Sequence, residues 1–133
     1  MGKYGQAAVM AAGLIESNRT NSPLEAWNIA TAEIFGEGTH GQKKGCPRGA
    51  FLGLCEEGLV RGIAPGKYTD SQKNKSYAIR GVELLKQDSS LLECPFKLWN
   101  AIGIKKSHNG QMDVVISLWN NNLIVSKQDT FKG

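Results

Sequence analysis

Apolar residues recur at helical spacing through most of the chain, in segments separated by glycine, proline and capping residues. Recurrence at i, i+3 and i+4 is typical of an amphipathic helix that buries one face. The pattern predicts an all-α protein of about six helices, over residues 4–17, 23–35, 47–57, 77–87, 95–102 and 112–120.

Capping residues support several of these boundaries. Ser22, Pro23 and Glu25 combine a hydroxyl N-cap, a proline in the first turn and the glutamate of a capping box, so a helix is predicted to start there. Gly58 suits a left-handed cap at the end of the third helix, and Asn122 can take the same role after the sixth.

The order of the predicted helices recurs with similar residues. The pattern Pro-x-x-x-Trp-Asn occurs at 23–28 and at 95–100, and residues 54–60 resemble residues 118–124. A third echo links the first helix to the fourth, with Ala8, Val9, Leu14 and Ile15 matching Ala78, Ile79, Leu84 and Leu85. The echoes have offsets of 72, 64 and 70 residues and keep their order, which predicts a duplicated three-helix unit.

Two such units are expected to pack into one compact domain, because a unit of this size buries too little surface alone. They cover about residues 3–63 and 71–127, with a breaker segment at 63–67 and a short C-terminal tail at 128–133. The largest side chains expected in the shared core are Trp27, Trp99 and Trp119.

Length and composition exclude several classes of protein. With 133 residues, 41% of them hydrophobic, the chain has the size and apolar content of one globular domain and is not intrinsically disordered. No apolar run approaches the ~18 residues of a membrane span, so no membrane association is expected. Residues 1–6 lack the apolar core of a signal peptide, and we expect a cytoplasmic protein.

The net charge of +4 comes entirely from the second part of the chain. Residues 1–66 hold six Lys/Arg and six Asp/Glu, whereas residues 67–133 hold ten and six. A basic excess fits an acidic partner, including nucleic acid. Because the charges are dispersed rather than gathered in a tail, a solvating surface is the simpler interpretation.

The three cysteines, Cys46, Cys55 and Cys94, show neither a Cys-x-x-Cys pair nor the spacing of a zinc site. Cys55 belongs to an apolar helical run and is expected in the core. Cys46 lies beside Lys43, Lys44 and Arg48, and a reactive thiol is one interpretation of this position, with His40 as the candidate base nearby. No metal site, cofactor or catalytic residue is predicted.

Two loops rich in polar and basic residues stand out. Residues 36–45 and 104–111 each contain His, Gly and Gln in that order and a Lys-Lys pair, and each precedes a helix N-terminus, which favours anions. The first loop is not a phosphate-binding P-loop, because Gln42 stands where lysine is required. The candidate partner-binding or anion-binding residues are His40, Gln42, Lys43, Lys44, Arg48, Lys105, Lys106, His108 and Gln111.

The two histidines allow three interpretations: loop or capping residues, recognition of an acidic group with the lysines, or a metal or general-base role. We expect a non-enzymatic binding or adaptor protein that contacts an unidentified protein or acidic partner through the two loops. One alternative is a nucleic-acid-binding module that contacts phosphates without reading the base sequence. The links of about ten and eight residues before the third and sixth helices are too long for a helix-turn-helix motif, so sequence-specific binding is not expected. A second is a small enzyme using His40 or Cys46.

Residues 42–60, QKKGCPRGAFLGLCEEGLV, resemble a family of small bacterial proteins of unknown function. The likeness extends from residues 2–8 through residues 111–115 and so covers nearly the whole chain. The family has no assigned catalytic residues, so the resemblance implies no activity. It implies an intracellular protein of bacterial or phage-borne origin that forms a single compact domain.

Overall fold

The computed structural model describes residues 2–125, which form seven α-helices and one 3-10 helix and contain no β-strand beyond an isolated bridge. The all-α prediction is therefore confirmed. No helix in this part of the chain is long and apolar enough to cross a membrane. The elements are α1 (Lys3–Glu16), α2 (Pro23–Phe35), α3 (His40–Lys43), α4 (Gly45–Glu56), α5 (Gln72–Gln87), η1 (Ser89–Glu93), α6 (Pro95–Ile102) and α7 (Gln111–Asn120).

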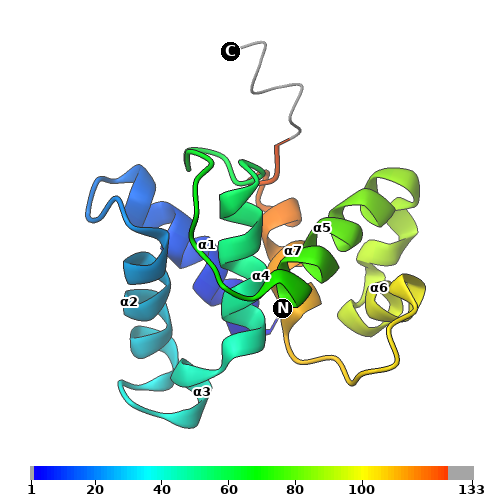
Figure 1. The fold of residues 1–133 in the computed structure, drawn as a ribbon, viewed down its shortest axis with the longest axis horizontal. Helices are drawn as coiled ribbons and strands as arrows, with labels where there is room; N and C mark the ends of the chain where they lie inside the picture. The colour runs from blue at the N-terminus through cyan, green and yellow to red at the C-terminus, as the bar shows by residue number, and fades with distance from the viewer. Residues whose placement is uncertain (1, 126–133) are drawn as a thin grey trace.

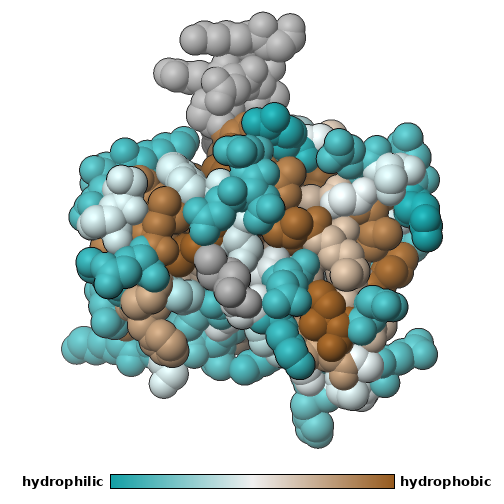
Figure 2. All heavy atoms as spheres, turned by 180° about the vertical axis from the view of Figure 1, so that it is seen from behind, coloured by the Kyte–Doolittle hydropathy of each residue, from teal (hydrophilic) through white to brown (hydrophobic). Residues whose placement is uncertain are grey.

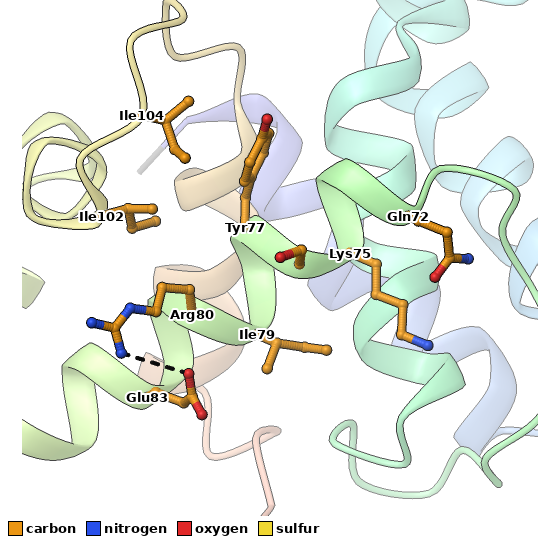
Figure 3. Close-up of a pocket in the computed structure, with 9 residues that line it drawn as sticks. Gln72, Lys75, Tyr77, Ile79, Arg80, Glu83, Ile102 and Ile104 are labelled. Carbon is orange, nitrogen blue, oxygen red and sulfur yellow. Dashed lines mark ion pairs between the residues drawn. The ribbon is translucent and has the colours of Figure 1, made fainter.

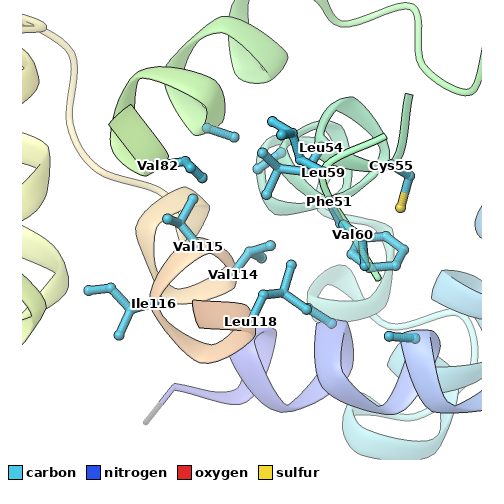
Figure 4. Packing of buried hydrophobic residues seen from close by; sticks show 14 of the residues in the cluster. Phe51, Leu54, Cys55, Leu59, Val60, Val82, Val114, Val115, Ile116 and Leu118 are labelled. Atoms are coloured by element: carbon cyan, nitrogen blue, oxygen red, sulfur yellow. The ribbon is translucent and has the colours of Figure 1, made fainter. Parts of the chain in front are cut away.

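Helices α4 and α7 lie at the centre, with α1 and α2 on one side and α5 and α6 on the other (Figure 1). Buried side chains of α4, α5 and α7 meet between these helices, as Figure 4 shows for Phe51, Leu54, Val82, Val115 and Leu118. The core is therefore built around the two central helices.

The outer helices pack across the molecule, α1 against α7 and α5 against α4. A Cβ at Gly5 in α1 would lie 2.8 Å from the carbonyl oxygen of Asp113, and one at Gly53 in α4 would lie 2.6 Å from the Cα of Lys75. Both positions need glycine because backbone atoms approach too closely for a side chain. The buried face of α1 is otherwise made of small residues, Ala7, Ala8, Ala11 and Ala12.

The predicted caps occur where expected. Ser22 Oγ accepts a hydrogen bond from Glu25 N (3.1 Å) at the start of α2. Gly58 (φ +73°) and Asn122 (φ +59°) follow α4 and α7 in the left-handed conformation. In both cases the next residue, a leucine, donates its N–H to the carbonyl oxygen five residues earlier, over 3.0 and 2.9 Å.

Three helical features differ from the prediction. Helix α5 begins at Gln72, whereas the prediction placed its start at Tyr77. The prediction missed the first five residues because residues 72–76 are polar and show no apolar periodicity. The four-residue helix α3 and the five-residue helix η1 were not predicted at all. Such short elements bury too few side chains to leave a helical pattern in the sequence.

The tryptophans lie in unequal surroundings. Trp27 and Trp99 are buried, and Trp119 is half-buried. The Trp27 ring stacks on Phe51, with centroids 5.3 Å apart, whereas the Trp99 ring meets Tyr77 edge-on, also at 5.3 Å. A duplicated three-helix unit would place Trp27 and Trp99 in equivalent surroundings, so these contacts do not support the duplication, which stays a prediction.

One backbone contact joins two segments that resemble each other in sequence. An antiparallel bridge joins Val60 and Ile124 beyond the ends of α4 and α7. The two paired residues are 64 positions apart, which is the offset of one sequence echo. One hydrogen bond lies on each side of the pair. These bonds run from Arg61 N to Leu123 O (2.8 Å) and from Val125 N to Leu59 O (2.9 Å). The predicted unit limits are not tested by this contact, and residues 126–133, including the expected tail, lie outside the described part.

A single carboxylate ties the α4–α5 connection to both helices. This connection, residues 57–71, crosses in front of α4 (Figure 1). Glu56 Oε1 accepts hydrogen bonds from Tyr68 N (2.8 Å) and Thr69 N (3.1 Å), and Glu56 Oε2 pairs with Lys75 Nζ at 2.6 Å. The hydrogen bond from Lys75, followed by those from the two backbone amides, lowers the pKa of Glu56 to about 2.

Replacing this carboxylate should weaken the fold. Glu56→Gln is expected to lower the free energy of unfolding at neutral pH by about 1.5–3 kcal/mol, the scale of a hydrogen bond to a charged group. Wild-type stability should fall as the pH drops from about 4.5 to about 2, because the unfolded chain then binds a proton more readily than the folded one. Urea unfolding across this pH range measures both effects. Glu83→Gln, in an exposed ion pair, is the control, and an equal loss there would contradict the assignment.

The α4–α5 crossing gives a second prediction. Gly53→Ala should destabilise the protein by about 1–3 kcal/mol, the usual cost of overpacking. Gly13 is the matched control, since a Cβ added there would have no other atom within 4 Å, and Gly13→Ala should stabilise α1 by about 0.5–1 kcal/mol. Thermal denaturation should move the two variants in opposite directions, and an unchanged Gly53→Ala variant would refute the close crossing.

Candidate functional site

The structure brings the two lysine-containing segments to one edge of the molecule. Helix α3 with the start of α4, and the α6–α7 loop at residues 103–110, lie along the lower edge in Figure 1. Exposed lysines of these segments and of the first turn of α5 are named the basic edge: Lys43, Lys44, Lys73, Lys105 and Lys106.

Tyr4 connects the two segments. Its hydroxyl donates to Gly41 O in α3 (2.9 Å), while Gly110 fits against its ring, where a Cβ would lie 2.9 Å from a ring carbon. Gly110 also needs its glycine conformation, φ +85°. Lys44 Nζ lies 5.9 Å from the centre of the Tyr4 ring, a cation–π distance that holds the ammonium group at the edge.

A polar cleft of about 430 Å³ opens between the starts of α4 and α5 and the α6–α7 loop. Lys73 and Lys106 supply its positive charges, and Trp99 Nε1 donates to Lys106 O (2.9 Å), which fixes the loop over the cleft. The other lining residues are Cys46, Asp70, Ser71, Gln72, Asn74, Tyr77, Ser107, Asn109 and Gln111.

A chain of hydrogen bonds holds this cleft in shape. Gln111, only 3% exposed, accepts from Asn109 N (2.7 Å) and donates from Nε2 to Asn74 Oδ1 (3.1 Å). Asn74 in turn donates from Nδ2 to Ser71 Oγ (2.8 Å). The side chain of Gln111 is therefore used inside the protein.

His108 also has an internal role. Its ring lies beside Phe96 and Trp99, at centroid distances of 5.2 and 5.4 Å, and its Nε2 accepts from Met112 N (2.9 Å) at the start of α7. Burial lowers the pKa of His108; the negative charge of Asp113 opposes this shift, and the charge of Lys44 adds to it. His108 thus caps α7 as a neutral imidazole.

The remaining candidates from the sequence lie around α3 and α4. Gln42 accepts from Gly38 N (2.7 Å) and donates to Asn28 O (3.1 Å), so its amide is also used internally. His40 is exposed on α3. Arg48 is half-buried and lines a second cleft of about 440 Å³, which shares Asp70 and Ser71 with the polar cleft.

A more apolar groove runs along α5 next to the polar cleft. Figure 3 shows Ile102 and Ile104 across from Tyr77 and Arg80, with Arg80 paired to Glu83 at 3.7 Å. The groove measures about 430 Å³. Gln72 and Tyr77 line both this groove and the polar cleft, so the two hollows adjoin.

Two contributors to this edge were missed in the sequence. Lys73 fell outside the predicted helices because α5 was expected to begin at Tyr77. Tyr4 was assigned only to the first helix, although its ring links distant segments. The run of polar residues after Ser71 was the one available signal for Lys73.

The two residues of the enzymatic alternative, His40 and Cys46, lie on different helices, α3 and α4. Cys46 is half-buried in the polar cleft and His40 is exposed on α3. Within residues 2–125, no group of three or more His, Cys, Asp or Glu side chains is placed to hold a metal ion. This edge offers a set of exposed ammonium groups beside an internally hydrogen-bonded polar cleft.

Comparison with known proteins gives one match. A model of a family described as of unknown function, DUF6979, matches residues 1–125. No curated protein and no solved structure matches the chain. The resemblance to a family of unknown function is thereby confirmed, while the bacterial or phage-borne origin stays an expectation.

The cap made by His108 should be visible in stability measurements. His108→Ala should cost about 1–2 kcal/mol, the scale of a lost helix cap. Wild-type stability should decrease as the pH falls below 6.5, because the unfolded imidazole protonates before the folded one, and the variant should lack this step. His40→Ala is the exposed control. Loss of the step in that variant, and not in His108→Ala, would contradict the capping role.

Proposed function

The chain belongs to DUF6979, a family of unknown function, and we propose that it is a non-enzymatic binding protein. Its partner is a protein with an acidic segment, which lies along the basic edge. The proposal is carried by one observation: segments distant in sequence place their lysines on the same edge.

The charge balance of this edge favours anions. The five lysines are exposed, while Asp113, the carboxylate that interacts with His108, is half-buried and its pKa is raised by burial. Asp70 is the exposed carboxylate that lines the polar cleft. Glutamate or aspartate side chains of a partner would therefore meet a net positive surface.

The internal hydrogen bonds indicate how such a partner would be held. Gln42, His108 and Gln111 are already bonded within the protein, so a ligand would be contacted mainly by the exposed lysines, with His40 and Arg48 beside them. Lysine ammonium groups bind carboxylates as flexible point charges without a fixed geometry. The adjoining α5 groove would accept an apolar side chain of the same acidic segment.

A fluorescent oligoglutamate peptide tests this proposal. Lys43→Ala with Lys44→Ala, and Lys105→Ala with Lys106→Ala, should each weaken peptide binding about 2- to 30-fold, the sum of two exposed ion pairs. Lys67→Ala with Lys86→Ala removes the same charge from exposed positions outside the basic edge and is the matched control. Fluorescence anisotropy at increasing salt gives the dissociation constants.

Two outcomes would overturn the proposal. An equal loss in the control pair would mean that net charge alone attracts the peptide. Tighter binding of duplex DNA than of the peptide, with a steep salt dependence, would assign the edge to nucleic acid instead.

A further inference from the structure

The outer face of α2 exposes apolar side chains next to the α3 end of the basic edge. Leu24 is 45% exposed and Ile29 is 43% exposed. Both line a cleft of about 500 Å³ between α2 and the segment before α3, together with Ala32. Exposed apolar groups beside a hollow are typical of an interaction surface.

The same cleft is acidic. Glu25 and Glu37 line it, and no lysine or arginine is among its described lining residues. Glu33 is exposed one helical turn after Ile29 and therefore lies on the same side of α2. This charge is opposite to that of the basic edge, so one partner would not suit both surfaces.

The walls of this cleft are fixed before any partner arrives. The Gln42 side chain links the backbone of Gly38 to that of Asn28, over 2.7 and 3.1 Å. Thr39 Oγ1 accepts from Gln42 N (3.2 Å) and so caps α3. A preformed surface lowers the entropy lost on binding.

We propose that the α2 face docks a basic amphipathic helix of a second protein partner. Apolar residues at helical spacing would cover Leu24 and Ile29, and lysine or arginine residues flanking them would pair with Glu25, Glu33 and Glu37. The charge complementarity selects a basic partner, and the two exposed apolar side chains select a helix with one apolar face.

The probe is a synthetic amphipathic helix of leucine and lysine, about four turns long. A peptide of the same composition with a scrambled order is its control. The wild-type protein should bind the amphipathic peptide saturably and the scrambled peptide at least about tenfold more weakly, because only an apolar face can bury Leu24 and Ile29. Equal binding of both peptides would overturn the proposal.

Variants then locate the site. Glu25→Gln with Glu37→Gln should weaken binding about 2- to 30-fold, and Leu24→Ala with Ile29→Ala about tenfold or more. The matched controls are Glu16→Gln with Glu83→Gln, and Met10→Ala, which change exposed groups elsewhere. Equal losses in the controls would refute the α2 site. Melting temperatures of all variants show whether a loss reflects unfolding, and amide chemical shifts of α2 in the wild type give a readout that needs no variant.

Discussion

The arrangement of the outer helices around α4 and α7 depends on how closely the helix backbones approach each other at the α1–α7 and α4–α5 crossings. Glycine at positions 5 and 53 removes the side chain where the partner's backbone lies. This contact fixes the outer helices against the central ones and aligns the starts of α4 and α7 along one edge. The lysine segments meet there because they immediately precede those two helices.

The surface carries two regions of opposite charge, the basic edge and the α2 face. The back of the molecule shows apolar side chains in separate patches among hydrophilic ones (Figure 2). The basic edge combines exposed ammonium groups with an internally hydrogen-bonded polar cleft, while the α2 face combines carboxylates with exposed Leu24 and Ile29. The two surfaces adjoin at α3, where Gln42 lines the cleft beside α2 and Lys43 belongs to the basic edge.

Local chemistry made much of the fold predictable. Ser22, Gly58 and Asn122 act through neighbouring residues, so their caps can be recognised in the sequence. The start of α5 could not be found in this way, because its first turn is polar and is held by Glu56, 19 positions before Lys75. The same limit applies at the candidate site: Gln111 bonds to Asn74, 37 positions away, and no local pattern encodes such a pair.

The bridge between residues 60 and 124 has a consequence for how the protein is made. Synthesis proceeds from the N-terminus, yet α1 finds its central partner only in α7, and the strand-like contact of Leu59 waits for Val125. The side of α1 that packs on α7 is therefore covered only after α7 has been synthesised. A nascent chain that stalls before α7 would leave this face of α1 exposed, and exposed apolar faces of this kind are what chaperones bind.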